Sequence, residues 1–432
     1  MRILFVSGEL IGASLCLRLK EEGNDVKLFI KDRKRRECLE GFVEKTLDWK
    51  QELSWVGKDG LIVFDDVGFG VEQDRLRRKG YRVVGGSALG DKLEKDREYG
   101  QKIFSSCGIP SNTSVLFDSP MDAFHFVKEN PGKWVVKQNE HNSALSYVGV
   151  CEDGKDVLSM LETYHLSGVR RISLQKKADG VEIAVGRFFN GNDWVGPICV
   201  NMEHKRLCNG DIGPLTGEMG TLMWFDDNEQ NPLFMRTLSL LKEYLVRADF
   251  RGYADINCLV SESTIVPIEA TMRFGCPTVQ LQTELLTSRW TDLLSALADR
   301  MDYDPSFKKE FGIVMTIAAP PFPYRSINGQ HSSHGMGVFF SKALTNEERS
   351  RVHLEEISLR KRQGNGMEHY IAGPFGYALY VTGSGRSVRD ARMQALNTVG
   401  KITIPKMFYR TDIGMRFEEK EEKLLRQWGW IS

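Results

Sequence analysis

The stretch EHKRLCNGDIGPLTGEMGT, residues 203–221, joins a basic run to a central carboxylate and four glycines. Glycine and proline at this density are poorly tolerated inside a helix or in a central strand. We therefore predict a long ordered loop whose backbone N–H groups face a ligand. Lys205 and Arg206 supply positive charge suited to a phosphate or an acyl phosphate. A glycine-rich surface turn is the alternative interpretation.

The length and composition of the chain fit a multidomain globular protein. Its 432 residues predict two to four domains at roughly 150 residues each. The apolar fraction of 41% and the charged fraction of 27% are ordinary, and a net charge of zero argues against a nucleic-acid or membrane-surface binder. The eight cysteines form no C-x-x-C pair, which is typical of a reducing compartment. No apolar run is long enough to span a bilayer, so we predict a cytoplasmic protein.

Residues 1–90 alternate between buried strands and helices. Continuous apolar runs at 2–7, 25–30 and 61–64 are separated by helical segments. This pattern predicts a parallel, doubly wound sheet that binds ligands at the carboxyl ends of its strands. The first turn, SGELIG, is not G-x-G-x-x-G, so a dinucleotide-binding oxidoreductase is poorly supported. The basic run KDRKRR at 31–36 is interpreted as a solvated loop, with a phosphate-facing patch as the minority alternative.

The middle of the chain predicts a small α/β unit followed by a larger antiparallel one. One amphipathic helix is predicted for 91–112, ended by Gly108 and Pro110. The other predicted elements are strands at 134–137, 172–176, 182–189, 193–202, 252–260, 264–270 and 313–319, and helices at 232–248 and 390–399. Residues 313–432 are predicted to form a separate α+β unit.

Three segments resemble one known family. The run HKRLCNGDIGPLTGEMG is similar to the HKR…GD.GP.TG.MG signature of the phosphoribosylamine–glycine ligases, members of the ATP-grasp superfamily. IEATMRFG at 268–275 and YRTDIG at 409–414 resemble the same family, and the resemblance covers nearly the whole chain. It implies an α/β and α+β multidomain fold. The implied domains are an N-terminal doubly wound parallel sheet at 1–92, a two-lobed ATP-grasp core at 93–312 with its small lobe at about 114–180, and a C-terminal α+β domain at 313–432.

The resemblance implies an ATP site between the two lobes. Arg97 and Lys137 would hold the ATP phosphates, with Arg97 at a position where the family usually has Lys. The strand 172–176 would receive adenine through Gln175 and Lys176, and Glu182 would accept the ribose hydroxyls. Taken alone, Arg97 is also consistent with an exposed helix charge, and Glu182 with a solvent-facing strand residue.

The resemblance also implies a Mg²⁺ (or Mn²⁺) site beside the phosphates. Asp255 on one strand, with Glu269 and Thr271 on the next, matches the family's metal-binding positions. The strand period of two puts Glu269 and Thr271 on one face, and oxygen ligands suit Mg²⁺. Thr271 stands where the family has Asn. Arg273 would stabilise the transferring phosphoryl group.

Substrate recognition is implied at two places. On the stretch 203–221, Lys205 and Arg206 would stabilise the acyl phosphate, and Asp211 would orient the amine or the amino acid. In the first turn, Gly8 and Gly12 would hold a sugar phosphate at a helix N-terminus. The other substrate-binding residues implied on this stretch are Gly213, Thr216, Gly217, Met219 and Gly220.

The chain departs from the family pattern in three respects. The first turn lacks the family's GGRE-like segment. The segment 138–147, where the family has a flexible glycine-rich loop over the triphosphate, contains no glycine. The replaced positions in the other motifs are Leu215, Glu218, Thr271 and Cys276.

The implied reaction is ATP-dependent carboxylate–amine ligation in purine biosynthesis. ATP would phosphorylate a carboxylate, and an amine would then attack the acyl phosphate, so that ADP and phosphate are released. The implied partners are small molecules, an amino acid such as glycine and an amine such as phosphoribosylamine, bound by a monomer or a homodimer. Two alternatives remain open: a paralogous ligase for another amine, as in nucleotide or base modification, and a nucleotide-binding protein that has lost turnover.

Overall fold

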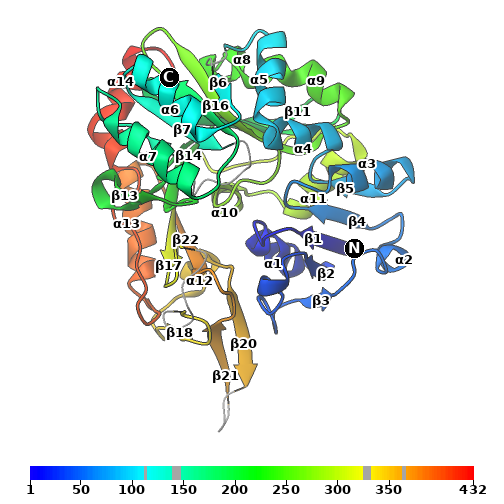
Figure 1. Ribbon diagram of the computed structural model, residues 1–432. Helices are drawn as coiled ribbons and strands as arrows, with labels where there is room; N and C mark the ends of the chain where they lie inside the picture. The colour runs from blue at the N-terminus through cyan, green and yellow to red at the C-terminus, as the bar shows by residue number, and fades with distance from the viewer. Residues whose placement is uncertain (111–113, 139–146, 325–331, 362–365) are drawn as a thin grey trace.

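The computed structural model of the protein describes residues 1–110, 114–138, 147–324, 332–361 and 366–432. It contains an N-terminal parallel sheet, a small lobe and a long antiparallel sheet (Figure 1). Within the described ranges, no helix is both long and apolar enough to cross a membrane.

The N-terminal unit is the parallel sheet that the apolar runs predict. Its strands lie in the order β3-β2-β1-β4-β5 and pair in parallel. The elements are β1 (Arg2–Ser7), β2 (Asp25–Ile30), β3 (Glu44–Thr46), β4 (Leu61–Phe64), β5 (Arg82–Val84), α1 (Ala13–Glu21), α2 (Leu53–Val56) and α3 (Gly70–Arg78). Strands buried on both faces read as unbroken apolar runs. β3 has no such run, because its three residues are polar and partly exposed, and the sequence did not predict it.

The basic run at 31–36 is only partly solvated. Within it, η1 (Arg33–Arg35) is a short 3₁₀ turn, and Arg35 is 3% exposed. The Arg35 guanidinium pairs with Glu355 at 2.9 Å and with Glu356 at 3.3 Å. The solvated-loop prediction is therefore wrong for Arg35, because its partners are supplied by a distant part of the chain.

Residues 88–106 form two helices where one was predicted. The helices α4 (Ala88–Lys95) and α5 (Arg97–Ser106) are separated at Asp96. The extended backbone of Asp96 lets its carboxylate accept a hydrogen bond from the Tyr99 N–H at 3.0 Å, which caps α5. The predicted helix 232–248 is divided in the same way, into α8 (Pro232–Arg236), η4 (Leu238–Leu241) and α9 (Lys242–Arg247).

The small lobe is an antiparallel sheet with a hydrophobic core of its own. Its strands lie in the order β6-β9-β7-β8. The elements are β6 (Ser114–Phe117), α6 (Pro120–Glu129), β7 (Trp134–Gln138), β8 (Tyr147–Val148), α7 (Lys155–Leu166) and β9 (Ile172–Lys176). Val136, Leu161 and Leu174 belong to a core cluster whose buried members all come from this lobe. The lobe is therefore packed as a distinct body beside the long antiparallel sheet, which is called the central sheet below (Figure 1).

An eight-stranded antiparallel sheet forms the large lobe and continues into the C-terminal part. Its order is β16-β15-β10-β11-β14-β17-β22-β19. The strands are β10 (Val181–Asn190), β11 (Trp194–Glu203), β14 (Gly220–Asp226), β15 (Arg251–Val260), β16 (Ile265–Thr271), β17 (Phe311–Ala318), β19 (Val352–Leu354) and β22 (Tyr377–Gly385). Three helices follow these strands: α10 (Thr278–Leu285), α11 (Trp290–Asp299) and α13 (Val388–Val399). The predicted boundary between 312 and 313 falls inside β17, so the C-terminal part shares this sheet with the large lobe.

The C-terminal part also contains a smaller sheet that extends away from the lobes (Figure 1). Its order is β20-β21-β18-β23. The remaining elements are β18 (Gly337–Phe340), α12 (Asn346–Ser350), β20 (Ile357–Lys361), β21 (Met367–Ile371), β23 (Ile402–Thr403), η6 (Phe417–Glu421) and α14 (Glu422–Gln427).

The stretch 203–221 is a hairpin and not the long loop predicted. Within it, β12 (Arg206–Cys208) pairs antiparallel with β13 (Ile212–Leu215). The φ angles of Gly210 and Asp211 are 72° and 53°, a left-handed conformation that suits Gly and is tolerated by Asp. The prediction failed because Gly210 and Asp211, the last two residues of the short η3 (Asn209–Asp211), confine the irregular backbone to one tight turn.

The YRTDIG segment fixes this hairpin from the C-terminal side. Arg410 is 1% exposed and donates to the Arg206 carbonyl at 3.0 Å. It also pairs with Asp211 at 2.7 Å and with Asp412 at 2.8 Å. Asp412 in turn accepts from the Gly210 N–H at 2.8 Å. The segment that resembles the family at the end of the chain therefore positions the segment that resembles it in the middle.

Candidate functional site

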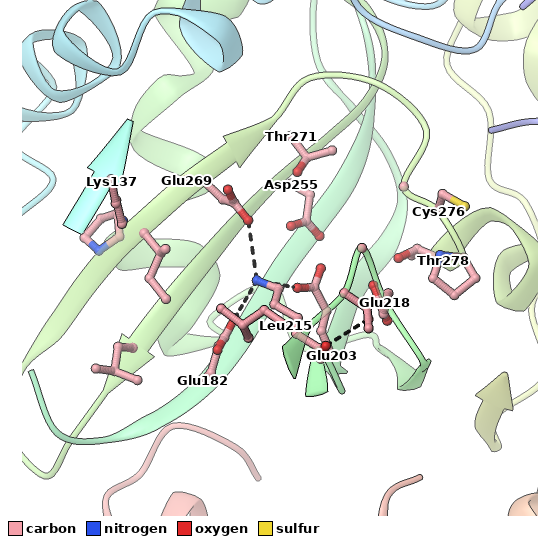
Figure 2. A pocket seen from close by; sticks show the side chains of 18 of the residues that line it. Lys137, Glu182, Glu203, Leu215, Glu218, Asp255, Glu269, Thr271, Cys276 and Thr278 are labelled. Carbon is pink, nitrogen blue, oxygen red and sulfur yellow. Dashed lines mark hydrogen bonds and ion pairs between the residues drawn. The ribbon is translucent and has the colours of Figure 1, made fainter. Parts of the chain in front are cut away.

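A cavity of about 750 Å³ lies where the small lobe, the central sheet, the hairpin and the N-terminal unit meet. Figure 2 shows the part of it between β7, the hairpin and the β15–β16 pair. The predicted site residues that line it are Arg97, Lys137, Gln175, Lys176, Glu182, Lys205, Thr216, Gly217, Asp255, Glu269, Thr271 and Arg273. Residues scattered over almost 180 positions are thus brought to one cavity.

The Lys205 ammonium lies at the centre of three carboxylates. It is 2.8 Å from Glu182, 2.9 Å from Glu203 and 3.5 Å from Glu269, contacts marked by dashed lines in Figure 2. These negative charges outweigh the burial of Lys205 and raise its pKa well above the ordinary value. The hairpin therefore places a positively charged lysine among three carboxylates of the central sheet.

The predicted metal-binding residues share one face of two neighbouring strands. Asp255 of β15 lies directly opposite Thr271 of β16, and Asn257 lies opposite Glu269. Side chains two residues apart on a strand point to the same face, and Asp255, Glu269 and Thr271 all line the cavity. Two carboxylates and a hydroxyl are oxygen donors that fit Mg²⁺, which needs few protein ligands when phosphate oxygens complete its shell.

No group of three or more His, Cys, Asp or Glu residues forms a preassembled metal cage in the described part of the chain. Mg²⁺ sites that include substrate phosphates do not require one. Five carboxyl groups, those of Glu182, Glu203, Glu218, Asp255 and Glu269, line the cavity around Lys205. Their oxygen atoms are the donors that Mg²⁺ prefers, so the donor set fits the implied metal.

Two of these carboxyl groups are deeply buried. Burial raises the pKa of Asp255 to about 7, with the Glu203 charge adding to the shift, although Asn201 and Tyr253 donate to Asp255 at 3.0 and 3.2 Å. Burial likewise raises the pKa of Glu218 well above its ordinary value. Both groups resist ionisation until a positive charge comes close.

Lys137 and Arg97 face the acidic strands from the side of the small lobe. Lys137 ends the apolar part of β7 and is 8% exposed, while Arg97 is the first residue of α5. Burial, together with the charges of Arg97 and Lys205, lowers the pKa of Lys137 to about 8, against the opposing effect of Glu269. This cluster of cations is suited to an anion with several charges, such as a triphosphate.

The lowered pKa of Lys137 predicts that affinity for ATP falls at alkaline pH. Lys137 is mostly protonated below its pKa of about 8 and loses its charge above it. Since a phosphate binds only the charged form well, the dissociation constant for ATP should rise between pH 8 and 9.5, with a limit of about tenfold per pH unit. Titration calorimetry at several pH values measures this. Lys137→Arg should flatten the dependence, and an equally steep rise in that variant would contradict the assignment.

The residues predicted to receive adenine and ribose lie in different surroundings. Gln175 and Lys176 at the end of β9 line the cavity. Glu182, however, accepts from Lys205 and Asn257, each at 2.8 Å. Glu182 therefore belongs to the carboxylate cluster around Lys205, and its role toward a ribose stays a prediction.

Arg273 lines the cavity, and its charge is already paired. Its Nε lies 3.1 Å from Glu94 and 3.6 Å from Asp66. Glu94 also accepts from the Met272 N–H, which fixes the turn after β16. Arg273 is thus held rigidly beside the β16 carboxylate, where it faces any group bound in the cavity.

Several predicted residues lie outside the cavity lining. Asp211 pairs with Arg410 at 2.7 Å and with Arg416 at 2.9 Å, and Arg206 donates to the Gly213 carbonyl. These contacts give Asp211 and Arg206 a role in holding the hairpin, so their catalytic roles stay predictions. The other predicted residues absent from the lining are Gly8, Gly12, Gly213, Met219 and Gly220. Met219 is fully buried beneath the hairpin.

The first turn uses its backbone donors internally. The N–H groups of Gly8 and Gly12 donate to the carboxylate of Asp65 at 3.1 and 2.8 Å. Asp65 is completely buried at the end of β4, and it also accepts from the Ser7 hydroxyl. The turn is therefore tied to a protein carboxylate, and the predicted sugar-phosphate role of its amides has no support from this geometry.

The sequence did not single out Arg35, Glu203 and Glu355, which line the cavity, or Asn257, which donates to Glu203. Glu203 forms an ion pair with Lys205, and Asn257 donates a hydrogen bond to Glu203. Arg35 forms an ion pair with Glu355. The only available signal for Asn257 was its position two residues after Asp255 on a strand. The segment predicted to cover the triphosphate, 138–147, lies mostly outside the described residues.

Comparison with known proteins agrees with this architecture. The model of the phosphoribosylglycinamide synthetase ATP-grasp (A) domain matches residues 95–277. The chain is 24% identical over 357 residues to a phosphoribosylamine–glycine ligase of Listeria innocua, covering 80% of this chain and 81% of the relative. A Helicobacter pylori protein of the same name is 24% identical over 363 residues, covering 81% and 80%.

Two solved structures show the same fold. The phosphoribosylamine–glycine ligase of Thermotoga maritima superposes with a TM-score of 0.72 at 17% identity, over 96% of this chain and 100% of that one. The biotin carboxylase of Campylobacter jejuni superposes with a TM-score of 0.63 at 10% identity, over 99% and 98%. Residues 95–277, which include the two lobes and the acidic strand pair, therefore match an ATP-grasp domain. Over about four fifths of its length, the chain is similar to the phosphoribosylamine–glycine ligases.

Proposed function

We propose that the protein is an ATP- and Mg²⁺-dependent ligase that joins a carboxylate to an amine through an acyl phosphate. The observation that carries this proposal is the Lys205 cluster: a hairpin lysine lies 3.5 Å from Glu269 of the acidic strand pair, in a cavity that Arg97 and Lys137 also line. Cations, metal-type carboxylates and a basic hairpin in one cavity are the parts that phosphoryl transfer to a carboxylate requires.

The residues that line the cavity have different roles, which depend on where they lie. Lys137 of the small lobe and Arg97 of α5 bind the ATP phosphates. Lys205 and Arg273 neutralise the charge that builds up on the transferred phosphoryl group and on the acyl phosphate. Because their partner carboxylates hold both of them in place, little reorganisation is needed during the reaction. The chemistry is therefore positioning and charge stabilisation, without a protein nucleophile.

Asp255, Glu269 and Thr271 would hold the Mg²⁺. When bound, the ion would screen the phosphate charges and withdraw electrons from the transferred group. Glu269 contacts Lys205 in this structure, so the carboxylate and the lysine are already placed side by side. Asn257 donates to Glu182 at 2.8 Å and to Glu203 at 3.1 Å, which fixes the orientation of these two carboxylates beside Lys205.

Transfer of an oxygen isotope tests the proposed reaction. A panel of amino acids and amines is incubated with ATP and Mg²⁺, and each acid is labelled with ¹⁸O in its carboxylate. A ligase should release ADP only with a matching acid, and one labelled oxygen should appear in the inorganic phosphate. Phosphoribosylamine with glycine belongs in the panel.

The test separates the ligase from the alternatives. ADP release with unlabelled phosphate would mean simple ATP hydrolysis. Binding of ATP by calorimetry without any acid-dependent ADP release would favour a nucleotide-binding protein that has lost turnover. Label transfer with an amine other than phosphoribosylamine would identify a paralogous ligase.

A further inference from the structure

The positions at which the chain departs from the family motifs come together in the cavity. They belong to two distant parts of the chain, the stretch 203–221 and the end of β16 with the turn after it. The replaced positions that line the cavity are Leu215, Glu218, Thr271 and Cys276. Of these four, Glu218 alone is a carboxyl group. A change in chemistry relative to the family therefore points to Glu218.

Glu218 lies in the connection between β13 and β14 and is held from two sides. It is 6% exposed, and one of its carboxylate oxygens accepts from the Thr221 hydroxyl. Its carbonyl oxygen accepts from the Thr316 hydroxyl at 3.0 Å. The second carboxylate oxygen accepts no hydrogen bond from the residues that the structure describes, and it is not sealed off from the cavity. This oxygen is therefore accessible to a molecule bound there.

Glu218 lies on the side of the cavity opposite to Lys137. Figure 2 shows Lys137 on the side of Glu269, and Glu218 on the other side, beside Glu203 and Cys276. The proposed function places the ATP phosphates at Lys137 and the acyl phosphate at Lys205. An amine has to reach the acyl carbon from the side that ADP does not occupy, because ADP is still bound when the acyl phosphate forms. That side is the side of Glu218.

Four of the other carboxyl groups that line the cavity already have a cationic partner. Three of them contact Lys205, and Glu355 pairs with Arg35 at 2.9 Å. Asp255 belongs to the predicted metal-binding face. Glu218 has neither role, since no ion-pair partner for it lies within the described ranges of the chain. Its carboxylate is thus available for a reaction with a substrate.

The surroundings of Glu218 strengthen its hold on a proton. Burial raises the pKa of Glu218 well above its ordinary value, and the charge of Glu203 adds to the shift, against the opposing effect of Lys205. The charges of Glu182 and Asp255 act in the same direction as that of Glu203. Burial penalises an ammonium as well as a carboxylate. When the two groups meet here, the neutral pair of carboxylic acid and amine is therefore favoured, and the amine regains its lone pair.

We propose that Glu218 is the general base of the ligation step, and that the attacking amine is a basic amine that reaches the cavity protonated. The proposal rests on the proposed ligase function and adds a catalytic residue and a class of amine to it. Glu218 takes one proton from the ammonium group, and the nitrogen lone pair then attacks the acyl carbon. The C–N bond forms, and the bond from the acyl carbon to the phosphate oxygen breaks, its electron pair leaving with the phosphate. The phosphate takes the second proton from the nitrogen, and Glu218 returns the first proton to water.

Two nucleophiles of similar size test this role. Hydroxylamine and methylamine differ in whether an oxygen or a carbon atom is attached to the nitrogen. Hydroxylamine is the much weaker base and has its lone pair at neutral pH, whereas methylamine is almost wholly protonated. The wild-type protein is incubated with ATP, Mg²⁺ and each acid of the isotope panel, and mass spectrometry measures the hydroxamate and the N-methylamide. We expect both products. Hydroxamate without N-methylamide would overturn the proposal, because a general base at this place has to activate a basic amine.

Variants of Glu218 show whether this carboxylate is responsible. Glu218→Gln should lower the formation of N-methylamide by about a hundredfold or more and leave that of hydroxamate within about threefold of wild type. Retained hydroxamate formation also shows that the variant is folded. Glu218→Asp keeps a carboxylate and should recover part of the N-methylamide rate. Glu262→Gln, at an exposed position in the turn between β15 and β16, is the matched control and should behave as wild type.

The ratio of the two products decides the assignment. A ratio of N-methylamide to hydroxamate that is unchanged in Glu218→Gln would overturn it. If Glu218→Gln does not fold, the same ratio is measured in Glu218→Asp, where it should be lower than in wild type because the shorter side chain moves the carboxylate away from the amine. An unchanged ratio in that variant would then overturn the assignment.

Hydroxamate formation separates failure of this proposal from failure of the proposed function. Hydroxylamine intercepts an acyl phosphate without the help of a base, so the hydroxamate reports the activation step alone. If wild type releases no ADP and forms no hydroxamate with any acid of the panel, the ligase function fails and the role of Glu218 fails with it. If wild type forms hydroxamate and the ratio of products does not depend on Glu218, the ligase function stands and the general base is rejected.

Discussion

Replacing Glu269 with glutamine should reduce the rate of acid-dependent ADP release by at least about a hundredfold. The change keeps the shape of the side chain and removes one of the two carboxylates on the metal-binding face. It also removes a partner of Lys205, 3.5 Å away. The binding of ATP in the absence of Mg²⁺ should change little, because the phosphates are held mainly by Arg97 and Lys137. Steady-state kinetics and calorimetry with and without Mg²⁺ measure the two effects separately.

Glu262→Gln provides the control for this substitution. Glu262 lies in the turn between β15 and β16 and is exposed, so the same chemical change is made on the same strand pair away from the cavity. It should leave both the rate and the Mg²⁺ dependence as in wild type. If Glu269→Gln retained most of the wild-type rate, the acidic strand pair would not be the metal site.

Replacing Arg410 with methionine should destabilise the protein by about 3 kcal/mol, the low end for breaking a buried ion pair, because the two aspartates are partly exposed. Arg410 is almost fully buried and links the hairpin to Asp412. Its loss leaves the Arg206 carbonyl without this donor and frees the hairpin that places Lys205. Activity should therefore fall together with stability. Urea unfolding followed by tryptophan fluorescence measures the free energy of unfolding.

The comparison for Arg410 is Arg389→Met on the exposed face of α13. This variant should differ from wild type by less than about 0.5 kcal/mol. Asp211→Asn adds a second comparison, because a residue that holds the hairpin should lower stability and activity together. A strong loss of kcat in Asp211→Asn at unchanged stability would instead support the role predicted for Asp211 from the sequence.

The sequence predicted the strands well where burial makes the pattern simple. β1, β2 and β4 match the predicted ranges, since buried parallel strands give continuous apolar runs. It failed where a single residue interrupts an otherwise regular pattern. The break at Asp96 is caused by a capping carboxylate, and nothing in the apolar periodicity on either side reveals it.

The candidate site also contains residues that sequence motifs indicate and residues whose position the motifs do not reveal. The residues of the acidic strands and the lysines were found because short motifs carry them, and the structure brings Lys137, Lys205 and Glu269 to one cavity. Asp211 belongs to the same motif as Lys205, yet it faces the other side of the hairpin, toward Arg410 and Arg416. Which side of a hairpin a residue occupies depends on the position of its turn, which here is set by Gly210 and Asp211.

The sheet shared by the large lobe and the C-terminal part limits where the gene can be recombined. A chimera joined at residue 312 would split β17 and take its two neighbours, β14 and β22, from different parents. Exchange of β6 through β9 cuts no sheet, because that segment keeps its whole core. Domain shuffling among relatives should therefore be productive at the connections before β6 and after β9, and unproductive at the C-terminal border.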